Sequence, residues 1–454
     1  MDKTIAAIST PLGSGGIGVI RISGSDAVAV ADKVFKSVSG KKICEMKGYT
    51  AAFGKIYDNN DQIDEAVATV FLSPHSYTGE DVVELSCHGG SYITNKVLTT
   101  VLNNGAVLAQ AGEFTKRAFL NGKIDLTQSE AVMDIISAKG RAAARSALSI
   151  KDGRLRSEID EVKNILVENA AHLSAWADYP EEDIPEVSGR NLLESISSAE
   201  DKLQKLLKGY EIGKAIKEGV DTLIIGKPNV GKSTLMNLLS GCEKSIVTNI
   251  PGTTRDIIQE TVVLGSAVLL LSDTAGLRDT DNPIEKIGVD LAKKRLKSCG
   301  LVLAVFDASM PLDENDHEMI ELLGDVPSIA VINKSDLETV VDIEYIKRKV
   351  DNIVFVSAAN GDGLEELTNA VGELLGTAQF DENAAVISTQ RQRECAVAAL
   401  DSMKEAVQAL EIGMTLDAVT VLLEEAIQSL LELTGERATE VVVHNVFSKF
   451  CVGK

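Results

Sequence analysis

Short apolar runs alternate with amphipathic stretches over the first 118 residues of the chain. Runs rich in Ile and Val predict strands, and these runs are Ile5–Ile8, Ile17–Ile22, Val67–Leu72 and Val82–Cys87. Apolar residues at helical spacing predict helices over Ser25–Phe35, capped by Ser25 or Asp26, and over Tyr92–Leu102. The pattern therefore predicts a compact mixed α/β domain over residues 1–118.

The pattern becomes helical over residues 119–218, with one expected break. That break is Asp178–Pro185, where two prolines and four acids predict a turn. After a polar connector at Thr377–Asn383, helical spacing returns over Gln390–Leu410 and Leu416–Leu433. Because neither helical stretch looks able to bury its apolar stripe alone, we expect residues 119–218 and 377–454 to form one helical domain. An α/β domain at 219–376 would be inserted into it.

The inserted region carries a phosphate-binding motif between a strand and a helix. An apolar run that ends at Ile225 leads into Gly226–Ser233, which reads Gly-Lys-Pro-Asn-Val-Gly-Lys-Ser and matches GxxxxGK[ST]. Backbone N–H groups and the following helix N-terminus would converge on phosphates there. Lys232 would neutralise the β/γ-phosphates, and the Ser233 hydroxyl would ligate Mg²⁺. An ordinary glycine-rich turn is the minor alternative.

Three further motifs follow apolar strands in the same region. Asp273–Gly276 (Asp-Thr-Ala-Gly) would hold Mg²⁺ through water and sense a γ-phosphate. In Asn333–Asp336 (Asn-Lys-Ser-Asp), the last carboxylate would accept from the guanine ring N–H and exocyclic amine, an arrangement that adenine does not offer. Ser357–Ala358 would support the guanine oxygen through its backbone. The four motifs, in this order, predict a GTPase rather than an ATPase.

The residue that orients the attacking water is not the usual one. Many GTPases place a glutamine after the Asp-x-x-Gly motif, whereas this chain has Leu277, which forms no side-chain hydrogen bond. The following loop offers the charged candidates Arg278, Asp279, Asp281, Glu285 and Lys286. Asn229 and the stretch Thr248–Thr254 place neutral oxygens near the phosphates, which suits a large monovalent cation in the role of an arginine finger. Equally open is that Asn229 only tethers a loop.

Length and composition indicate a protein of several domains in a reducing compartment. The 454 residues suggest about three domains, and 44% hydrophobic residues suffice for packed cores. The longest apolar runs, such as Leu301–Phe306, fall far short of the roughly 18 residues of a membrane span, and the N-terminus opens no signal peptide. Six cysteines occur singly, and five histidines form no metal-ligand pattern. We therefore expect a cytoplasmic protein with reduced thiols.

The charge distribution is uneven. A formal net charge of −22 does not favour nucleic-acid binding, which requires an excess of Lys and Arg. One expected helical segment is instead positively charged, because Lys139–Arg156 carries six basic residues and a single acid, Asp152. This segment is either a solvated helix face or a surface for tRNA or a protein partner.

Further runs resemble the MnmE (TrmE) family of bacterial tRNA-modification GTPases, among the TrmE-Era-EngA-like GTPases, along essentially the whole chain. The matching runs are Thr4–Ile8, Gly15–Gly18, Arg21–Gly24, Gly79–Leu85, Cys87–Gly90 and Gly112–Gln128. Cys451–Lys454 is similar to the family's terminal Cys-Ile-Gly-Lys. The departures are small: Ala111 stands where a proline is usual, and Val452 replaces isoleucine.

The resemblance implies a folate-binding α/β domain that dimerises, a discontinuous helical domain and an inserted Ras-like P-loop GTPase domain. With the FAD-dependent partner MnmG (GidA), in a heterotetramer or larger complex, such proteins add an aminomethyl or carboxymethylaminomethyl group to C5 of the wobble uridine of certain tRNAs. The carbon comes from 5-formyl- or 5,10-methylene-tetrahydrofolate. Matching positions imply folate binding by Arg21, Glu84, Lys123 and Lys454. Cys451 beside them is either a nucleophile or an inert packed thiol.

For the GTPase domain, the resemblance assigns ligands and a catalytic residue. It implies K⁺ ligation by Asn229, Thr248, Ile250 and Thr253, and Mg²⁺ ligation by Ser233 and Thr254. It selects Glu285 among the charged candidates as the residue that orients water. The implied GTP contacts are Asn229, Val230, Gly231, Lys232, Ser233, Thr234, Thr248, Asn249, Ile250, Pro251, Gly252, Thr253, Thr254, Asp273, Thr274, Ala275, Gly276, Asn333, Lys334, Asp336, Ser357 and Ala358.

Two other functions are compatible with parts of the sequence. A ribosome-assembly GTPase that binds RNA without modification chemistry would also carry a run such as Gly252–Asp256. The acidic chain, with neither a basic RNA-binding appendage nor a second GTPase module, is unfavourable to that reading. A purely regulatory switch with an unused N-terminal domain is the third possibility.

Overall fold

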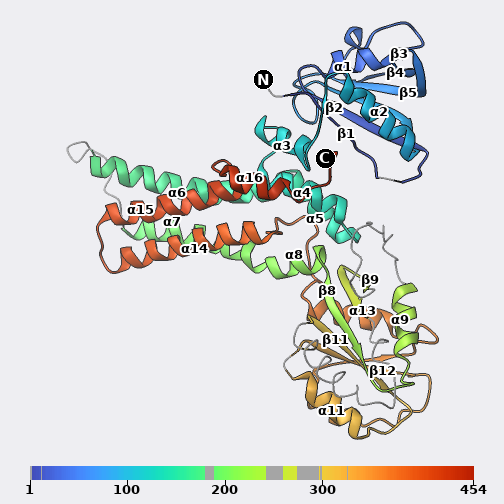
Figure 1. Ribbon diagram of the computed structural model, residues 1–454. Helices are drawn as coiled ribbons and strands as arrows, with labels where there is room; N and C mark the ends of the chain where they lie inside the picture. The colour runs from blue at the N-terminus through green and yellow to red at the C-terminus, as the bar shows by residue number, and fades with distance from the viewer. Residues whose placement is uncertain are drawn as a thin grey trace, which may run out of the picture. The chain divides into compact units, whose positions relative to one another are not determined.

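The structure is a computed structural model that describes residues 3–11, 13–178, 189–241, 259–272, 296, 299–324 and 326–454 (Figure 1). It divides into two compact units, one of residues 1–133 and 425–454 and one of residues 134–424. The mixed α/β and α fold class predicted from the sequence is confirmed. The predicted domain limits 1–118, 119–218, 219–376 and 377–454 stay a prediction. In the described part of the chain, no helix is long and apolar enough to cross a membrane.

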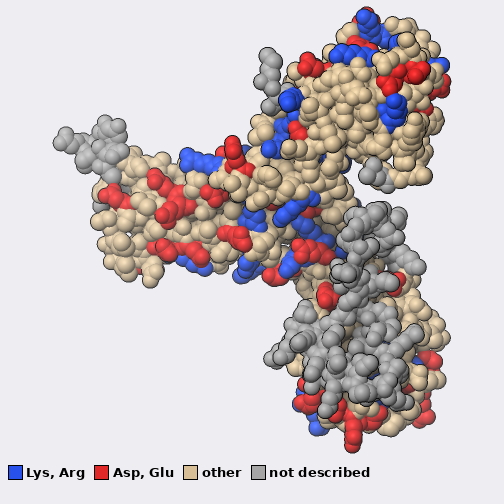
Figure 2. Space-filling model, in the orientation of Figure 1, with Lys and Arg blue, Asp and Glu red and all other residues tan. Residues whose placement is uncertain are grey.

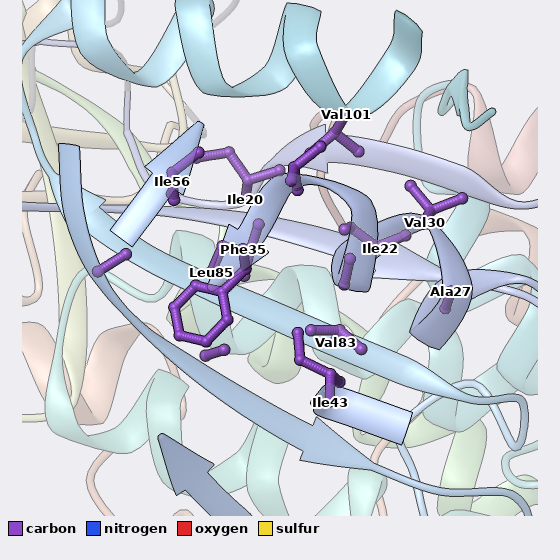
Figure 3. Packing of buried hydrophobic residues seen from close by; sticks show 14 of the residues in the cluster. Ile20, Ile22, Ala27, Val30, Phe35, Ile43, Ile56, Val83, Leu85 and Val101 are labelled. Atoms are coloured by element: carbon purple, nitrogen blue, oxygen red, sulfur yellow. The ribbon is translucent and has the colours of Figure 1, made fainter. Parts of the chain in front are cut away.

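The first unit is built on a seven-stranded sheet of described residues, in the order β3-β4-β5-β6-β2-β1-β7. The strands are β1 (Ile5–Ile8), β2 (Ile17–Ser23), β3 (Phe35–Ser37), β4 (Thr50–Asp58), β5 (Asp61–Phe71), β6 (Val82–His88) and β7 (Val107–Leu108). Helices α1 (Ala27–Val34) and α2 (Ser91–Asn103) pack on one face of this sheet, with the short 3₁₀ helix Ile43–Glu45 beside α1. Figure 3 shows the shared core, to which Ile20, Leu85 and Val101 contribute.

The predicted strands and helices of this unit all form. Most differ from the prediction by one or two residues at their ends, whereas β5 begins at Asp61, six residues before the predicted start at Val67. The helix expected over Ser25–Phe35 occupies Ala27–Val34, and Asp26 stands at its N-cap position but makes no side-chain capping hydrogen bond. Strand β4 was not predicted. Its pairing with β5 buries Ile56, yet most of its residues remain partly exposed, so its sequence lacks a strong apolar signal.

Four further described helices lie wholly or partly in the first unit. They are α3 (Glu113–Leu120), α4 (Leu126–Ser137), α15 (Leu416–Thr434) and α16 (Glu440–Phe447), and the unit limits fall inside α4 and α15. Leu126, Phe447 and Phe450 form a small buried cluster between them. After α16, Val452 forms a β-bridge with Ala111, which follows β7, and Gly453 then approaches Ile8 at the end of β1. This brings the last residues close to the sheet.

The second unit contains the helices α5 (Arg141–Lys151), α6 (Arg154–Asp178), α7 (Gly189–Lys208), α8 (Tyr210–Lys217) and α14 (Gln390–Glu411). Helix α7 packs against both α6 and α14 (Figure 1). The expectation of a single break in residues 119–218 was wrong. Gly140 has an extended backbone before α5, and Gly153 adopts φ +94° between α5 and α6, so both glycines interrupt the helix. The turn predicted at Asp178–Pro185 lies, from residue 179 on, outside the described residues.

A six-stranded sheet of described residues forms the rest of this unit, in the order β13-β12-β11-β8-β10-β9. Its strands are β8 (Val220–Ile225), β9 (Gln259–Leu264), β10 (Ala267–Ser272), β11 (Leu301–Asp307), β12 (Ser328–Asn333) and β13 (Asn352–Val356). Its described helices are α9 (Lys232–Gly241), α11 (Glu314–Leu323), α12 (Ile343–Lys347) and α13 (Leu364–Leu374). All strand pairs are parallel except β9–β10.

Central strand β11 is buried on both faces, as parallel sheets covered by helices require. Leu303 and Val305 face the core that includes α9 and α13, whereas Val302 and Ala304 face the core that includes α11 and α12. The carboxyl ends of β8, β11, β12 and β13 therefore lie along one edge of the sheet. Ligands of open α/β sheets bind at such an edge.

Candidate functional site

The phosphate loop leaves β8 and enters α9 as the sequence predicts. Gly226 and Gly231 have φ +153° and +97°, and a Cβ at Gly231 would lie 2.2 Å from Asn333 Nδ2, so a glycine is required there. Lys232 Nζ donates to the carbonyl oxygens of Gly226 and Lys227, each at 2.6 Å. Ser233 and Thr234 lie exposed in the first turn of α9. The phosphate loop thus wraps around the ammonium group of Lys232. It lies beside the N-terminus of α9, which favours anions.

Buried Asn333 joins three of the four predicted motifs. Its Nδ2 donates to the carbonyl of Val230 at 2.8 Å, and its Oδ1 accepts from the N–H of Ala358 at 3.0 Å. Only 3% of Asn333 is exposed, so both hydrogen bonds are shielded from water. One side-chain amide therefore fixes the phosphate loop, the Asn-Lys-Ser-Asp motif and the Ser357–Ala358 loop relative to one another.

The two charged side chains of the Asn-Lys-Ser-Asp motif are each held by a partner. Ser357 Oγ donates to Asp336 Oδ1 at 2.6 Å and leaves the exposed carboxylate oriented at the sheet edge. Lys334 Nζ bonds Asp307 Oδ2 at 2.6 Å. Burial alone would raise the pKa of Asp307, but hydrogen bonds from Lys334 and Ser309 outweigh it and hold that pKa below its usual value.

Sequence reasoning missed a second set of supports for the phosphate loop. Lys227 Nζ lies 2.8 Å from Asp313 Oδ2 and 2.6 Å from Asp316 Oδ2, at the start of α11. Burial would lower the pKa of Lys227, but the hydrogen bonds to both carboxylates raise it. A cavity of about 540 Å³ lies next to this cluster. The signal available in the sequence was the capping pattern Asp313-x-x-Asp316, which marks a helix start beside the loop.

The other predicted nucleotide and metal residues lie outside the described residues. They are Thr248, Asn249, Ile250, Pro251, Gly252, Thr253, Thr254, Asp273, Thr274, Ala275, Gly276 and Glu285. The three described motifs of the guanine-nucleotide site nevertheless converge at the carboxyl ends of β8, β12 and β13.

A second polar cluster lies in the first unit, on the sheet face opposite the core. Arg21 and Glu84 are direct cross-strand partners on β2 and β6, and Arg21 Nε donates to Glu84 Oε1 at 2.8 Å. The Arg21 guanidinium also lies 5.7 Å from the Tyr77 ring and 5.5 Å from the Phe114 ring. A charged pair with two aromatic faces suits a ligand that combines a flat ring with polar edges.

The last residues of the chain reach this cluster. Arg21 Nη1 and Ser9 Oγ donate to the carbonyl of Gly453, at 3.4 and 3.0 Å. Gly453 has φ +97°, and a Cβ there would lie 2.3 Å from Ile8 O, so the tail approaches β1 more closely than another residue would allow. Burial and the nearby Arg21 lower the pKa of Lys454, while Glu84 opposes them. Arg21, Glu84 and Lys454 therefore lie close together.

The fourth predicted folate residue, Lys123, contacts the loop beside the cluster and not Arg21 itself. Its Nζ donates to the carbonyl of Pro74 at 3.0 Å, and its side chain lies against Gly79. Pro74 and Gly79 flank Tyr77, whose ring faces Arg21. Lys123 thus contacts the loop that supplies an aromatic wall of the cluster, and no recorded contact joins it to Arg21 among the described residues.

Sequence reasoning also missed the buried network behind this loop. Arg117, 7% exposed, donates to both carboxylate oxygens of Glu80 at 3.1 Å and to Glu113 at 3.0 Å. Glu80 also accepts from Ser23 at 2.7 Å. Both Glu80 and Arg117 fall inside runs that resemble the family, which was the available signal. The network ties α3 to the loop that carries Tyr77.

No described residues form a group of three or more His, Cys, Asp or Glu side chains that could hold a metal ion. The described cysteines Cys44, Cys87, Cys299 and Cys451 are free thiols. Burial, assisted by Asp64, raises the pKa of Cys87 to about 11, which disfavours its thiolate form. Cys451 is exposed.

The fold and the site together define a class of protein. A mostly parallel, doubly covered sheet carries a phosphate loop, and a guanine-type Asn-Lys-x-Asp motif is anchored to that loop at the same edge. This is the arrangement of a P-loop GTPase.

Comparisons with known proteins identify the family. A family model described as the MnmE helical domain matches residues 126–451, and one described as the GTP-binding protein TrmE N-terminus matches residues 4–123. The chain is 43% identical to the tRNA modification GTPase MnmE of Clostridioides difficile over 100% of both chains. It is 44% identical to that of Thermoanaerobacter pseudethanolicus over 99% of both. The chain belongs to the MnmE family of tRNA modification GTPases, which confirms the resemblance seen in its motifs.

Among solved structures, a structure of Era from Aquifex aeolicus bound to GDP and AlF₄⁻ is similar over 41% of this chain and 67% of that chain. The identity is 27% and the TM-score 0.27.

Proposed function

We propose that this GTPase couples its nucleotide cycle to the addition of a carboxymethylaminomethyl or aminomethyl group to C5 of the wobble uridine of certain tRNAs. An FAD-dependent MnmG partner and a tetrahydrofolate one-carbon donor, 5-formyl or 5,10-methylene, complete the proposal. The observation that carries it is the Arg21–Glu84–Lys454 cluster in a chain that also holds a guanine-nucleotide site. A ribosome-assembly GTPase would have no use for such a cluster.

The nucleotide site fits the metal ions that the family implies. Mg²⁺ prefers oxygen ligands, and the exposed Ser233 hydroxyl at the start of α9 supplies one, with Thr254 as the second. Asn229 is exposed in the phosphate loop with φ +66°, a conformation that asparagine tolerates, so its amide oxygen is accessible to K⁺. Thr248, Ile250 and Thr253 would complete the K⁺ site. The bound cation would offset charge that develops on the phosphates.

The cation assignment predicts a specific salt effect. GTP turnover is expected to be at least about tenfold faster in KCl than in NaCl at equal ionic strength, because Na⁺ is too small for a site of several neutral oxygens. Phosphate release measured in each salt, with choline chloride as the ionic-strength control, checks this. Equal rates in KCl and NaCl would remove the K⁺ site from the proposal.

The cluster in the first unit fits a reduced folate. The aromatic rings of Tyr77 and Phe114 beside Arg21 suit a flat pterin or benzoyl ring, and Glu84 offers acceptor oxygens to pterin N–H groups. Arg21 and Lys454 are cations that suit the glutamate tail. When bound, the folate supplies the one-carbon unit, and these residues bind and orient it.

Replacing Lys454 by methionine is expected to weaken tetrahydrofolate binding by roughly tenfold or more, because a partly buried cation is lost opposite the anionic tail. Lys449→Met, at an exposed position before the tail, is the matched control and should bind like the original chain. Deleting residues 451–454 should have a larger effect, since Gly453 also fixes Arg21. Calorimetric titration of the folate into each full-length variant decides. Unchanged affinity in Lys454→Met excludes this lysine from the site.

A homodimer through the first unit is part of the proposal. Ile17, Phe53 and Val67 are 67%, 53% and 38% exposed. Strand register places all three on the same sheet face as Arg21 and Glu84. An exposed apolar sheet face of this kind is typical of a protein–protein interface. Its neighbourhood would place the folate cluster close to the partner subunit.

A further inference from the structure

Positive charge is concentrated in two segments of the second unit. Residues 139–156 and 202–217 contain eleven Lys or Arg and only two acids, Asp152 and Glu211, within a chain of net charge −22. We call these basic side chains the basic helix surface; they are Lys139, Arg141, Arg145, Lys151, Arg154, Arg156, Lys202, Lys205, Lys208, Lys214 and Lys217. The concentration of basic residues in these two segments requires an explanation, because the net negative charge of the protein opposes the approach of polyanions.

The two segments lie against each other in the fold. Ala142 and Ala143 of α5 pack with Ile216 of α8 in one buried cluster, and Lys139 Nζ lies 3.4 Å from the Glu218 carbonyl. Helix α8 follows α7 directly, so the lysines at the end of α7 join the same region. Figure 2 shows blue side chains gathered where Figure 1 draws α5 and α8.

Two nearby acids are each shared between two cations, whereas Arg154, Lys202 and Lys217 have acidic partners of their own. Glu382 lies 3.8 Å from Arg141 Nε and 3.4 Å from Arg145 Nη1, so one carboxylate serves two guanidiniums. Asp160 likewise serves Arg156 and Lys163. Arg141 and Arg145 remain 73% and 51% exposed and stand one helical turn apart on the outer side of α5. Their charge is available to a ligand that approaches from solvent.

The surface lacks the features of a protein interface. Leu148, 44% exposed, is the one exposed large apolar residue in residues 139–156 and 202–217, all of which the structure describes. Protein interfaces are depleted of Lys and are centred on aromatic or apolar anchors. Exposed Arg and Lys spread over adjoining helices instead suit the phosphates of a nucleic-acid backbone.

We propose that the basic helix surface binds the phosphodiester backbone of the tRNA substrate. The inference rests on the proposed role in tRNA modification and adds the place of contact. Contacts of this kind position the nucleic acid without reading its sequence. Arg141 and Arg145, which share Glu382 on the exposed side of α5, are the central pair.

The test measures tRNA affinity of the full-length protein by fluorescence anisotropy over a range of salt concentrations. Arg141→Gln with Arg145→Gln should raise the Kd roughly tenfold and lower the slope of log K against log salt by about 1.5, since each lost phosphate contact removes about 0.7–0.9. Lys347→Gln with Lys349→Gln removes two exposed, ion-paired cations elsewhere in the second unit and should change neither.

A third variant reverses the sign. Glu382→Gln removes the carboxylate that the two arginines share, so it should tighten tRNA binding about two- to fivefold and steepen the salt slope. A merely structural role for these residues would not produce tighter binding. Basal GTP turnover should be unchanged in all three variants, because none of these residues lies in the nucleotide site.

The inference is overturned if the arginine variant keeps the tRNA affinity and salt slope of the original chain, or if the lysine control loses as much tRNA affinity as the arginine variant does. The surface would then suit an acidic protein partner. Failure of the original chain to bind tRNA would overturn both this surface and the proposed function. If tRNA binds normally but GTP turnover does not depend on K⁺ and the protein does not bind folate, the result counts against the proposed function and leaves the basic helix surface standing.

Discussion

Replacing Glu285 by alanine is expected to lower kcat for GTP hydrolysis by roughly 10²–10³-fold while GTP affinity stays nearly unchanged. Leu277 stands where many GTPases have the glutamine that orients water, so another side chain must hold the nucleophile. Family resemblance selects Glu285, which lies outside the described residues. A residue that acts only on the attacking water contributes in the transition state and little to ground-state binding.

The measurement is phosphate release under saturating GTP in KCl, together with the Kd for a non-hydrolysable GTP analogue. Asp281→Ala removes a carboxylate from the same loop and is the matched control, with turnover expected within about twofold of the original. Comparable turnover in Glu285→Ala and Asp281→Ala would return the role to the other charged residues between Arg278 and Lys286. A parallel loss of affinity would instead indicate a binding role.

Asp336→Asn is expected to weaken GTP binding by about 10²–10³-fold and to favour xanthosine triphosphate. The guanine edge presents two donors, the ring N–H and the exocyclic amine, and a carboxylate accepts from both. Asparagine keeps one acceptor for one guanine donor, but its amide NH₂ then faces the other, so that guanine donor and the asparagine amide are left without an acceptor. Xanthine has a carbonyl in place of the exocyclic amine and pairs with the asparagine.

Ser357 determines how the side chain at position 336 is oriented in this variant. Its hydroxyl fixes one carboxylate oxygen of Asp336 at 2.6 Å, so the replacement amide is held in a similar plane. Competition binding of GTP, ATP and xanthosine triphosphate to the full-length variant measures the change. Asp351→Asn, at the exposed residue that precedes β13, is the control with unchanged preference. Undiminished GTP affinity in Asp336→Asn would contradict guanine recognition by this motif.

The local parts of the nucleotide site were predictable because strand, loop and helix follow one another in the sequence. Ile225 ends a buried strand, Gly226–Ser233 carries the phosphate motif, and α9 begins at Lys232, so short-range pattern sufficed. The same holds for β12 and β13, whose ends carry Asn333 and Ser357. Residues close in sequence reach their places by secondary structure alone.

Long-range partners could not be read from the sequence. The Lys334–Asp307 and Lys227–Asp316 pairs depend on which strands and helices adjoin, and β-strand order is not encoded in local periodicity. The contact between Arg21 and Gly453 joins residues 432 positions apart. The resemblance placed Lys454 near Arg21, whereas physical reasoning about the tail as a chain end gave no reason for it.

The two hydrogen bonds of Asn333 have a consequence for how the nucleotide is recognised. Because one amide ties the loop for the phosphates to the loop for the base, a ligand that fills either end steadies the other. Guanosine and inorganic triphosphate should therefore bind weakly when each is offered alone. The sum of their two binding free energies should fall short of the binding free energy of intact GTP by more than the loss of the covalent link between them explains. The site thus favours the intact nucleotide over either of its two parts.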